Sequence, residues 1–229
     1  MRPFMAYILH IDTSAEKGLV ALAVNGVIMA KEETATARDH ASSINIMIDK
    51  VAKQAGAELK QIDALAVVGG PGSYTGLRIG LATAKALCYV LEKPLILHNK
   101  LMLLALQQLS GKKNKGYISF AALLPARQQE YFFAQYNAAG EAIKEPTHIL
   151  ADELQHLLAN AGGRTLLAGL RGDGGQYITD QDGVEYVEHE TIDLDYWCLK
   201  AGEDYDCHSF VNVANAEPFY LKQVYTHKP

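Results

Sequence analysis

Short apolar runs open the chain and predict a group of three strands. They lie at 6–11, 19–24 and 27–30, and polar turns separate them. Asn25-Gly26 stands between the second and third runs and favours a tight hairpin, because both residues tolerate positive φ. The pattern therefore predicts three strands in antiparallel succession.

Apolar residues at helical spacing come next. Segment 40–55 is expected to form a helix that Asp39 caps and Gly56 ends. Ile46 falls on the face opposite the apolar stripe of this helix. An exposed isoleucine there indicates a helix that is covered on two sides.

The rest of the first half alternates strands with helices. The near-continuous apolar run 62–68 predicts a strand buried on both faces. A glycine-rich turn then leads into a helix at 77–91, followed by a strand at 94–97 and a helix from Asn99 to about Leu109. Three antiparallel strands followed by parallel crossovers are the order of a ribonuclease-H-like half-domain, which we expect over residues 1–110.

A second, smaller α/β subdomain is expected over 111–229. The polar stretch 112–115 marks its boundary with the first subdomain. The predicted elements are strands at 117–124, 130–136 and 166–170 and helices at 151–160 and 193–205.

The charge of the chain argues against direct binding of nucleic acid by this chain alone. The 229 residues include 26 acidic and 21 basic ones, a net charge of -5. Proteins that hold phosphate backbones by themselves usually carry a basic field. The segment 171–206 is distinctly acidic. Any contact with RNA is therefore expected to run through a partner.

Cysteine usage and the start of the chain indicate a cytoplasmic protein. Cys88, Cys198 and Cys207 lack the spacing of a disulfide framework or a zinc site, so reduced thiols are expected. The opening apolar run is interrupted by His10 and Asp12 and is interpreted as a strand, not as a signal peptide. No apolar stretch approaches the roughly 20 residues that span a bilayer, so no membrane partner is expected.

The glycine-rich turn 69–76 is the most informative segment. A strand, a glycine loop and a helix N-terminus together present unpaired N–H groups and the positive end of the helix dipole, as in anion sites. Ser73 or Thr75 can cap the helix. The spacing matches neither a Walker loop nor the dinucleotide fingerprint. Composition alone leaves two interpretations equally open, an anion site and a tight turn with close helix packing.

Two further features also allow two interpretations. Gly76, Gly80 and Ala84 recur every four residues, so another element can approach this helix closely, either within the chain or from a second chain. Asp12-Thr13-Ser14 ends the first strand. Such a turn meets metal-bound phosphate in kinase-like proteins, but it more often caps only its own backbone.

The sequence lacks the motifs of several hydrolases. None of the eight histidines forms an i, i+4 pair, so a zincin-type metalloprotease is unsupported. No Gly-x-Ser-x-Gly elbow is present, and no cysteine stands near a plausible base.

The motifs of the first half resemble those of one family. Segment 70–80, Gly-Pro-Gly-Ser-Tyr-Thr-Gly-Leu-Arg-Ile-Gly, is similar to the signature of the TsaB (YeaZ) family, and Ile-Asp-Thr-Ser at 11–14 precedes it at the expected place. His40-Ala-Ser, at the start of the first helix, resembles the His-Ser segment of that family.

The resemblance is strong over residues 6–110 and thinner beyond 137. Ala126-Arg127 is similar to the Asp-Ala-Arg element of the family, although Pro125 replaces the aspartate. The tail at 218–222 resembles its closing Pro-x-Tyr-Leu-Arg.

The resemblance implies an actin-like (ASKHA) fold with two subdomains and no catalytic metal. In chains like the catalytic paralogue TsaD, the strand matching 94–97 leads into Asn-His-x-x-x-His, whose histidines hold a metal. Lys100 and Leu104 occupy those two positions here. An ammonium and an isobutyl group cannot coordinate a cation. The resemblance therefore implies a non-catalytic partner of an enzyme, without catalytic or metal-binding residues of its own.

The implied partners belong to the machinery that puts threonylcarbamoyl on tRNA adenosine. They are TsaD as heterodimer partner, the ATPase TsaE and the supplier TsaC, with tRNA reached only through the complex and a homodimer when the chain is alone. The helices at 40–55 and 77–91 are expected to pack against those of TsaD, and a bulky residue at Gly80 to abolish the heterodimer without unfolding the chain. The expected interface residues are Ile46, Gly76, Arg78, Gly80 and Ala84.

No cofactor is expected on the isolated chain, although ATP or ADP is expected at the subunit boundary. The expected nucleotide-binding residues are Asp12, Thr13, Ser14, Gly72, Ser73 and Thr75. Two alternatives stay open. One is a small-molecule kinase or ATPase of the actin-like superfamily, and the other is a glycoprotease-like peptidase.

Overall fold

The opening strands pair as the hydrophobic pattern predicts. In the computed structural model, β1 (Tyr7–Asp12), β2 (Leu19–Val24) and β3 (Val27–Glu33) form an antiparallel succession, with the β2–β3 turn at positive φ. The strand β4 (Ala64–Gly70) lies parallel to β1, and β5 (Leu95–Asn99) follows it, so that the strand order is β3-β2-β1-β4-β5. The structure describes residues 6–34, 39–110, 116–160, 162–172 and 183–221.

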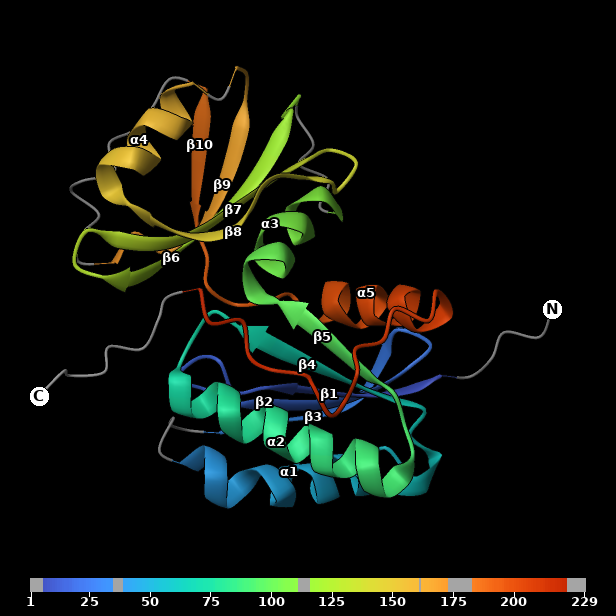
Figure 1. The fold of residues 1–229 in the computed structure, drawn as a ribbon. Coiled ribbons are helices and arrows are strands. Elements are labelled where there is room, and N and C mark those ends of the chain that lie inside the picture. The colour runs from blue at the N-terminus through green and yellow to red at the C-terminus, as the bar shows by residue number, and fades with distance from the viewer. Residues whose placement is uncertain (1–5, 35–38, 111–115, 161, 173–182, 222–229) are drawn as a thin grey trace, which may run out of the picture. The chain divides into compact units, whose positions relative to one another are not determined.

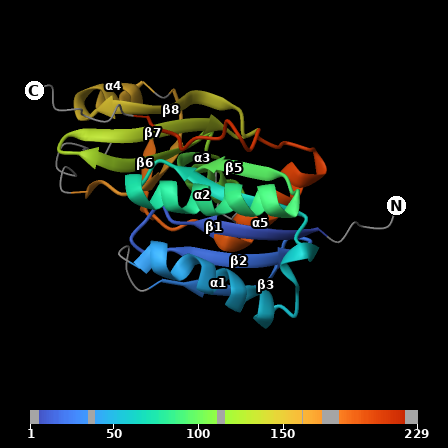
Figure 2. The ribbon, with the colours of Figure 1, turned by 60° about the horizontal axis from the view of Figure 1, so that its bottom comes forward.

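The helices α1 (His40–Gln54) and α2 (Tyr74–Leu91) cover one face of this sheet (Figures 1 and 2). The predicted apolar stripe of α1 is buried there. A short 3-10 turn, η2 (Leu59–Gln61), precedes β4. The core beneath the two helices includes Leu9, Ile11, Ile44, Met47, Val51, Leu65, Val67 and Leu81.

The ends of the two helices differ in detail from the prediction. Asp39 stands at the N-cap of α1, but its side chain makes no capping hydrogen bond; instead its carbonyl oxygen accepts a hydrogen bond from Ser42 Oγ at 3.1 Å. Gly56, at φ 64, follows the end of α1 as predicted. The helix α2 begins three residues earlier than expected, because Ser73 is its cap.

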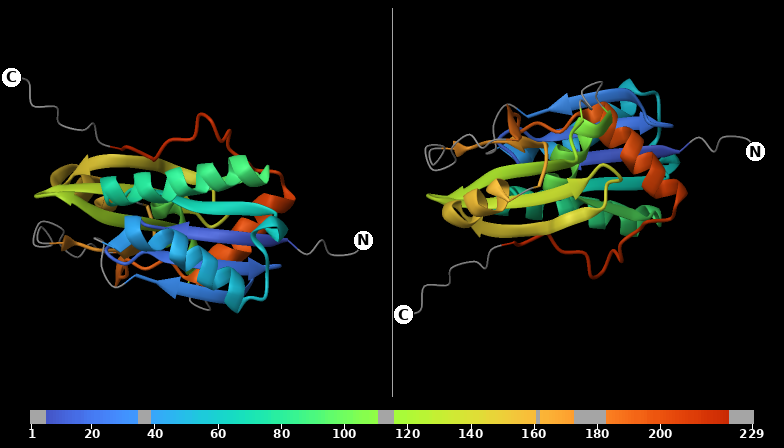
Figure 3. Two further views of the ribbon diagram at one scale, coloured as in Figure 1. Left: turned by 90° about the horizontal axis from the view of Figure 1, so that it is seen from below. Right: turned by 90° about the horizontal axis from the view of Figure 1, so that it is seen from above.

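The helix α5 (Leu194–Asp206) covers the opposite face of the same sheet and contacts β1 and β3 (Figure 3). The chain then returns along β5 as a segment that we call the C-terminal strap (residues 211–219). Its Val211 bridges Leu95, and the Phe219 N–H donates to the Gly69 carbonyl at 2.8 Å. The ammonium of Lys85 donates to the carbonyls of Ala214 and Ala216, both at 3.0 Å.

The second sheet repeats the topology of the first. Its strands β6 (Ser119–Arg127), β7 (Glu130–Asn137) and β8 (Ala142–Leu150) are antiparallel, whereas β9 (Thr165–Gly169) and β10 (Val184–Glu188) run parallel to β6, in the order β8-β7-β6-β9-β10. The helix α3 (Lys100–Ser110) packs on β6 and β7, and α4 (Ala151–Ala159) packs beside β8. The two edge strands β8 and β10 were not predicted.

The chain divides into two compact units. One contains the residues up to 98 together with 194–219, and the other contains 99–193 and the residues from 220. This division differs from a single boundary at residue 110, because α3 packs on the second sheet and α5 packs on the first. The predicted boundary stretch 112–115 lies outside the described residues. None of the described helices has the length and apolarity needed to cross a membrane.

Candidate functional site

The turn at the end of β1 lies directly against the glycine loop at the start of α2. The Ser73 N–H donates to the Ser14 carbonyl at 2.8 Å. The Thr13 hydroxyl donates to the Gly76 carbonyl at 2.7 Å, and Ser73 Oγ accepts from the Gly76 N–H at 3.2 Å as the helix cap. The two segments that sequence reasoning singled out therefore form one site, about 60 residues apart along the chain.

Glycine is required in the loop by this close approach. A β-carbon on Gly72 would clash with the backbone of Ser14, and one on Gly76 would clash with the Thr13 carbonyl. Gly80, one turn further along α2, faces the Thr13 hydroxyl in the same way. Composition left open two interpretations of this loop, an anion site and a tight turn with close helix packing. These contacts are direct observations of close packing.

The predicted nucleotide-binding residues fall into two groups. Asp12 Oδ1 accepts from the Ser14 N–H at 2.8 Å, and Thr13 and Ser14 are buried, each 3% exposed. The Ser14 hydroxyl has no hydrogen-bond partner within the described part of the chain. The remaining predicted residues lie open to solvent, namely Gly72, Ser73 and Thr75.

An anion can approach only the open group. The first N–H groups of a helix lack partners within the helix, and here Ser73 takes the one of Gly76. Thr13 directs its hydroxyl to a backbone carbonyl of the loop, so its hydroxyl hydrogen is already engaged. A phosphate at the N-terminus of α2 would therefore contact the exposed residues of the glycine loop. The buried turn at the end of β1 packs against that loop and would not contact the phosphate.

The predicted partner interface needs a correction at three positions. Gly76, Gly80 and Ala84 are buried, and the two glycines face Thr13 of the same chain. The small-residue stripe therefore allows α2 to approach β1, and these residues are not available to a second chain. Ile46 is 56% exposed and Arg78 is also exposed, as a docking surface requires.

Side chains that do not bind cations occupy the two positions where the resemblance places metal-binding histidines. Lys100 is the first residue of α3 and is 4% exposed, and Leu104 is fully buried on the same helix. No group of three or more His, Cys, Asp or Glu side chains that could hold a metal occurs among the residues that the structure describes.

A buried polar chain that sequence reasoning missed links α5 to β5. The indole N–H of Trp197 donates to His98 Nδ1 at 3.0 Å, so His98 carries its hydrogen on Nε2 and donates to Asp204 at 2.8 Å. Lys200 donates to the other Asp204 oxygen at 2.5 Å. Burial raises the pKa of Asp204, but the hydrogen bonds from His98 and Lys200 outweigh it and hold that pKa below its ordinary value.

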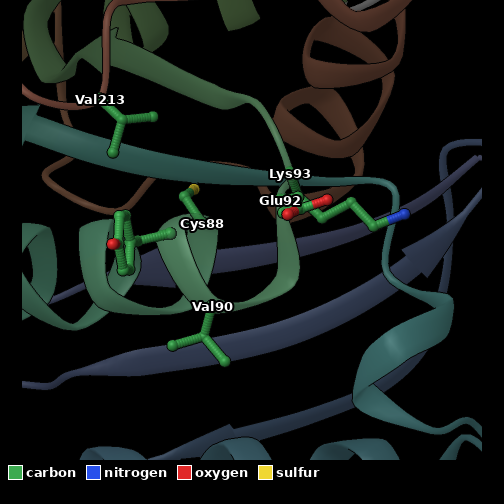
Figure 4. Close-up of a pocket in the computed structure, with 6 residues that line it drawn as sticks. Cys88, Val90, Glu92, Lys93 and Val213 are labelled. Carbon is green, nitrogen blue, oxygen red and sulfur yellow. The ribbon is translucent and has the colours of Figure 1, made fainter.

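A surface hollow of about 590 Å³ lies at the C-terminal end of α2 (Figure 4). Figure 4 shows Val213 on the C-terminal strap and the other labelled side chains at the end of α2. Burial raises the pKa of the Cys88 thiol at its floor to about 11, so the thiol stays protonated. The hollow is lined by Cys88, Tyr89, Val90, Glu92, Lys93 and Val213.

Two sheets of the same strand order, each with three antiparallel strands followed by parallel ones, place the chain in the actin-like class of α/β proteins. The solved structure of YeaZ from Pseudomonas aeruginosa shares this fold, with a TM-score of 0.74 at 24% identity over 95% of this chain and 100% of that one.

Sequence comparisons narrow the class to a family. The family model described as TsaD, tRNA N6-adenosine threonylcarbamoyltransferase, matches residues 31–174. The TsaB protein of Escherichia coli K12, named for tRNA threonylcarbamoyladenosine biosynthesis, is 31% identical over 94% of each chain. A TsaB protein of Haemophilus influenzae is 34% identical over 56% of this chain and 52% of its own. The chain belongs to the TsaB family.

Proposed function

We propose that this chain is a non-catalytic partner subunit in the synthesis of threonylcarbamoyladenosine on tRNA. Membership of the TsaB family over nearly its whole length supports the pathway. The observation that carries the non-catalytic role is the pair Lys100 and Leu104, both buried, in the frame where the resemblance expects two metal-binding histidines. Without a metal at that place, transfer of a carbamoyl group would lose its main electrostatic stabiliser.

The catalytic partner is TsaD, assisted by TsaE, in the cytoplasm. The exposed faces of α1 and α2, with Ile46 and Arg78, form the surface for TsaD in this proposal, and the isolated chain pairs with itself. Transfer RNA is bound through the complex, which agrees with the net charge of -5. A nucleotide at the subunit boundary would contact the exposed residues Gly72, Ser73 and Thr75, with Asp12, Thr13 and Ser14 behind them.

The kinase and peptidase alternatives gain no support from the site. A kinase would use Thr13 toward a phosphate, but its hydroxyl already donates to Gly76. A peptidase needs a nucleophile beside a base or a metal. The thiol of Cys88 is buried with a raised pKa, and Cys198 is also buried.

Reconstitution tests the proposal. TsaC, TsaD, TsaE, ATP, threonine, bicarbonate and tRNA are combined with and without this chain, and modified adenosine is measured by mass spectrometry. Modification is expected only when the chain and TsaD are both present. A matched sample containing the chain without TsaD, checked for bound divalent ions by elemental analysis, is expected to give neither metal nor product. Product from the chain without TsaD would contradict the non-catalytic role, and full modification in its absence would contradict the partner role.

A further inference from the structure

His40 is a buried histidine to which the proposed function gives no role. It is the first residue of α1 and is 1% exposed. Its Nε2 lies 3.1 Å from the Ala15 carbonyl oxygen. Because a carbonyl oxygen only accepts hydrogen bonds, Nε2 carries a hydrogen, and Nδ1 of the neutral imidazole is therefore an acceptor. The hydrogen-bond partners of the ring thus determine its tautomer.

Thr34, just after the end of β3, completes this set of hydrogen bonds. Its Oγ1 lies 3.3 Å from His40 Nδ1 and donates the hydroxyl hydrogen to that nitrogen. The same oxygen accepts from the Gly18 N–H at 2.7 Å, and the Thr34 N–H donates to the Gly18 carbonyl at 2.8 Å. We call His40 and Thr34, with their hydrogen bonds to Ala15 and Gly18, the histidine clamp. It ties residues 15–18 to the end of β3 and to the start of α1.

The histidine clamp is closely packed. A β-carbon on Gly18 would lie 2.8 Å from His40 Nδ1, so glycine is needed for the imidazole to come this close. The described residues around the ring leave no room for a water molecule. Solvent therefore cannot replace a hydrogen bond that His40 or Thr34 loses, and a buried polar group left unpaired is costly. The clamp is thus sensitive to the loss of a single partner.

The turn that the clamp holds is also bonded to the glycine loop. One residue before Ala15, the Ser14 carbonyl accepts from the Ser73 N–H at 2.8 Å. Ser73 is the cap of α2, and its hydroxyl accepts from the Gly76 N–H. A shift of residues 14–18 would therefore move Ser73, an exposed residue that the proposed function places against a nucleotide.

We infer that His40 is a positioning residue of the glycine loop. Its Nε2–H holds the turn 14–18 at the distance from α2 at which the Ser14 carbonyl accepts from the Ser73 N–H. Through these two residues it fixes the exposed part of the loop that a nucleotide phosphate would contact, as supporting residues do behind a binding site. The inference rests on the proposed function only where a nucleotide is placed at the glycine loop.

Amide hydrogen exchange of the full chain, resolved by residue with NMR, tests this role through Thr34. Thr34→Val keeps the shape of the side chain but removes the hydroxyl, whereas Thr34→Ser keeps the hydroxyl. Thr34→Val is expected to speed exchange of the Ser73 amide about tenfold or more, and Thr34→Ser to stay close to the wild type. The amide of Val67, in the buried strand β4, reports general loosening of the first unit. It should change less than Ser73, since a purely structural role would speed exchange at both amides equally.

Changes at His40 itself provide a second test. His40→Gln retains a donor and an acceptor in one amide, whereas His40→Leu has neither. Exchange at Ser73 is expected to be fast in His40→Leu and to return most of the way to the wild-type rate in His40→Gln. Ile46→Asp, on the exposed side of the same helix, is the matched control and should leave exchange at Ser73 unchanged.

Calorimetric titration with ADP relates the clamp to the proposed nucleotide. In the complex of the full chain with TsaD, Thr34→Val is expected to weaken ADP binding about tenfold, whereas Thr34→Ser should bind ADP as the wild type does.

Three results would overturn the inference: exchange at Ser73 unchanged in both Thr34→Val and His40→Leu, equal acceleration at Ser73 and Val67, or ADP affinity unaltered by Thr34→Val. Absence of ADP binding by the wild-type complex would instead contradict the nucleotide in the proposed function. The exchange rates would then decide the role of His40 by themselves, so the two failures give different results.

Discussion

His10 shows how one buried imidazole links stability to pH. It is completely buried on the α5 face of β1, with its ring edge-on to Trp197 at 4.9 Å between centroids. Its Nδ1 bonds the Ile8 carbonyl at 3.1 Å, and its Nε2 has no partner within the described residues. Burial, aided by the nearby His98, lowers the pKa of His10 from 6.5 to about 3.

Between pH 3 and pH 6.5, His10 therefore binds a proton in the unfolded chain but not in the folded chain. Stability from this group is full above about pH 6.5 and falls as the pH drops toward 3; at pH 5 the loss is about 2 kcal/mol. His10→Phe keeps an aromatic ring but removes the titrating group. Urea denaturation at pH 7.5 and pH 5 should show a smaller loss for the variant than for the wild type, by about 2 kcal/mol. Equal losses in the two proteins would show that His10 does not determine this dependence.

At the scale of elements, the packing of α2 on β1 depends on Gly80. A β-carbon there would meet the Thr13 hydroxyl, which is buried and bonded to Gly76. Gly80→Val is therefore expected to destabilise the first unit by about 2–3 kcal/mol. The sequence alone had predicted a different outcome, in which a bulky residue at Gly80 abolishes the heterodimer and leaves the chain folded. Chemical denaturation measures this, with Ala41→Val on the exposed side of α1 as the control. An unchanged midpoint for Gly80→Val would restore the interface interpretation.

The attachment of α5 depends on its polar chain to β5. His98→Leu would leave the buried Trp197 N–H and the Asp204 carboxylate without that partner, at an expected cost of about 2–3 kcal/mol. Trp197 is the sole tryptophan and is fully buried, so its fluorescence reports this unfolding directly. His148→Leu breaks a half-exposed pair with Glu130 and should cost less than about 1 kcal/mol. Similar costs for the two variants would contradict a special role of the buried chain.

At the scale of the whole molecule, hydrophobic periodicity predicted the first sheet and its helices, because buried and exposed positions are clearly separated in these elements. It missed β8 and β10 because these edge strands are partly exposed and carry no continuous apolar run. The motif at 70–80 located the glycine loop, but spacing alone could not say which surface the small residues of α2 face. The Trp197–His98 bond joins residues 99 positions apart, a pairing that no local pattern encodes.

The first unit is built from two separate stretches of chain, since α5 and the strap complete a sheet that begins near the N-terminus. Its β1 surface around His10 therefore stays uncovered during translation until α5, at 194–206, has been made. The second unit, drawn mainly from the continuous stretch 99–193, has all of that stretch available earlier. On the ribosome, the sheet that is begun first thus receives its covering helix α5 only after residues 99–193 of the second unit have been made.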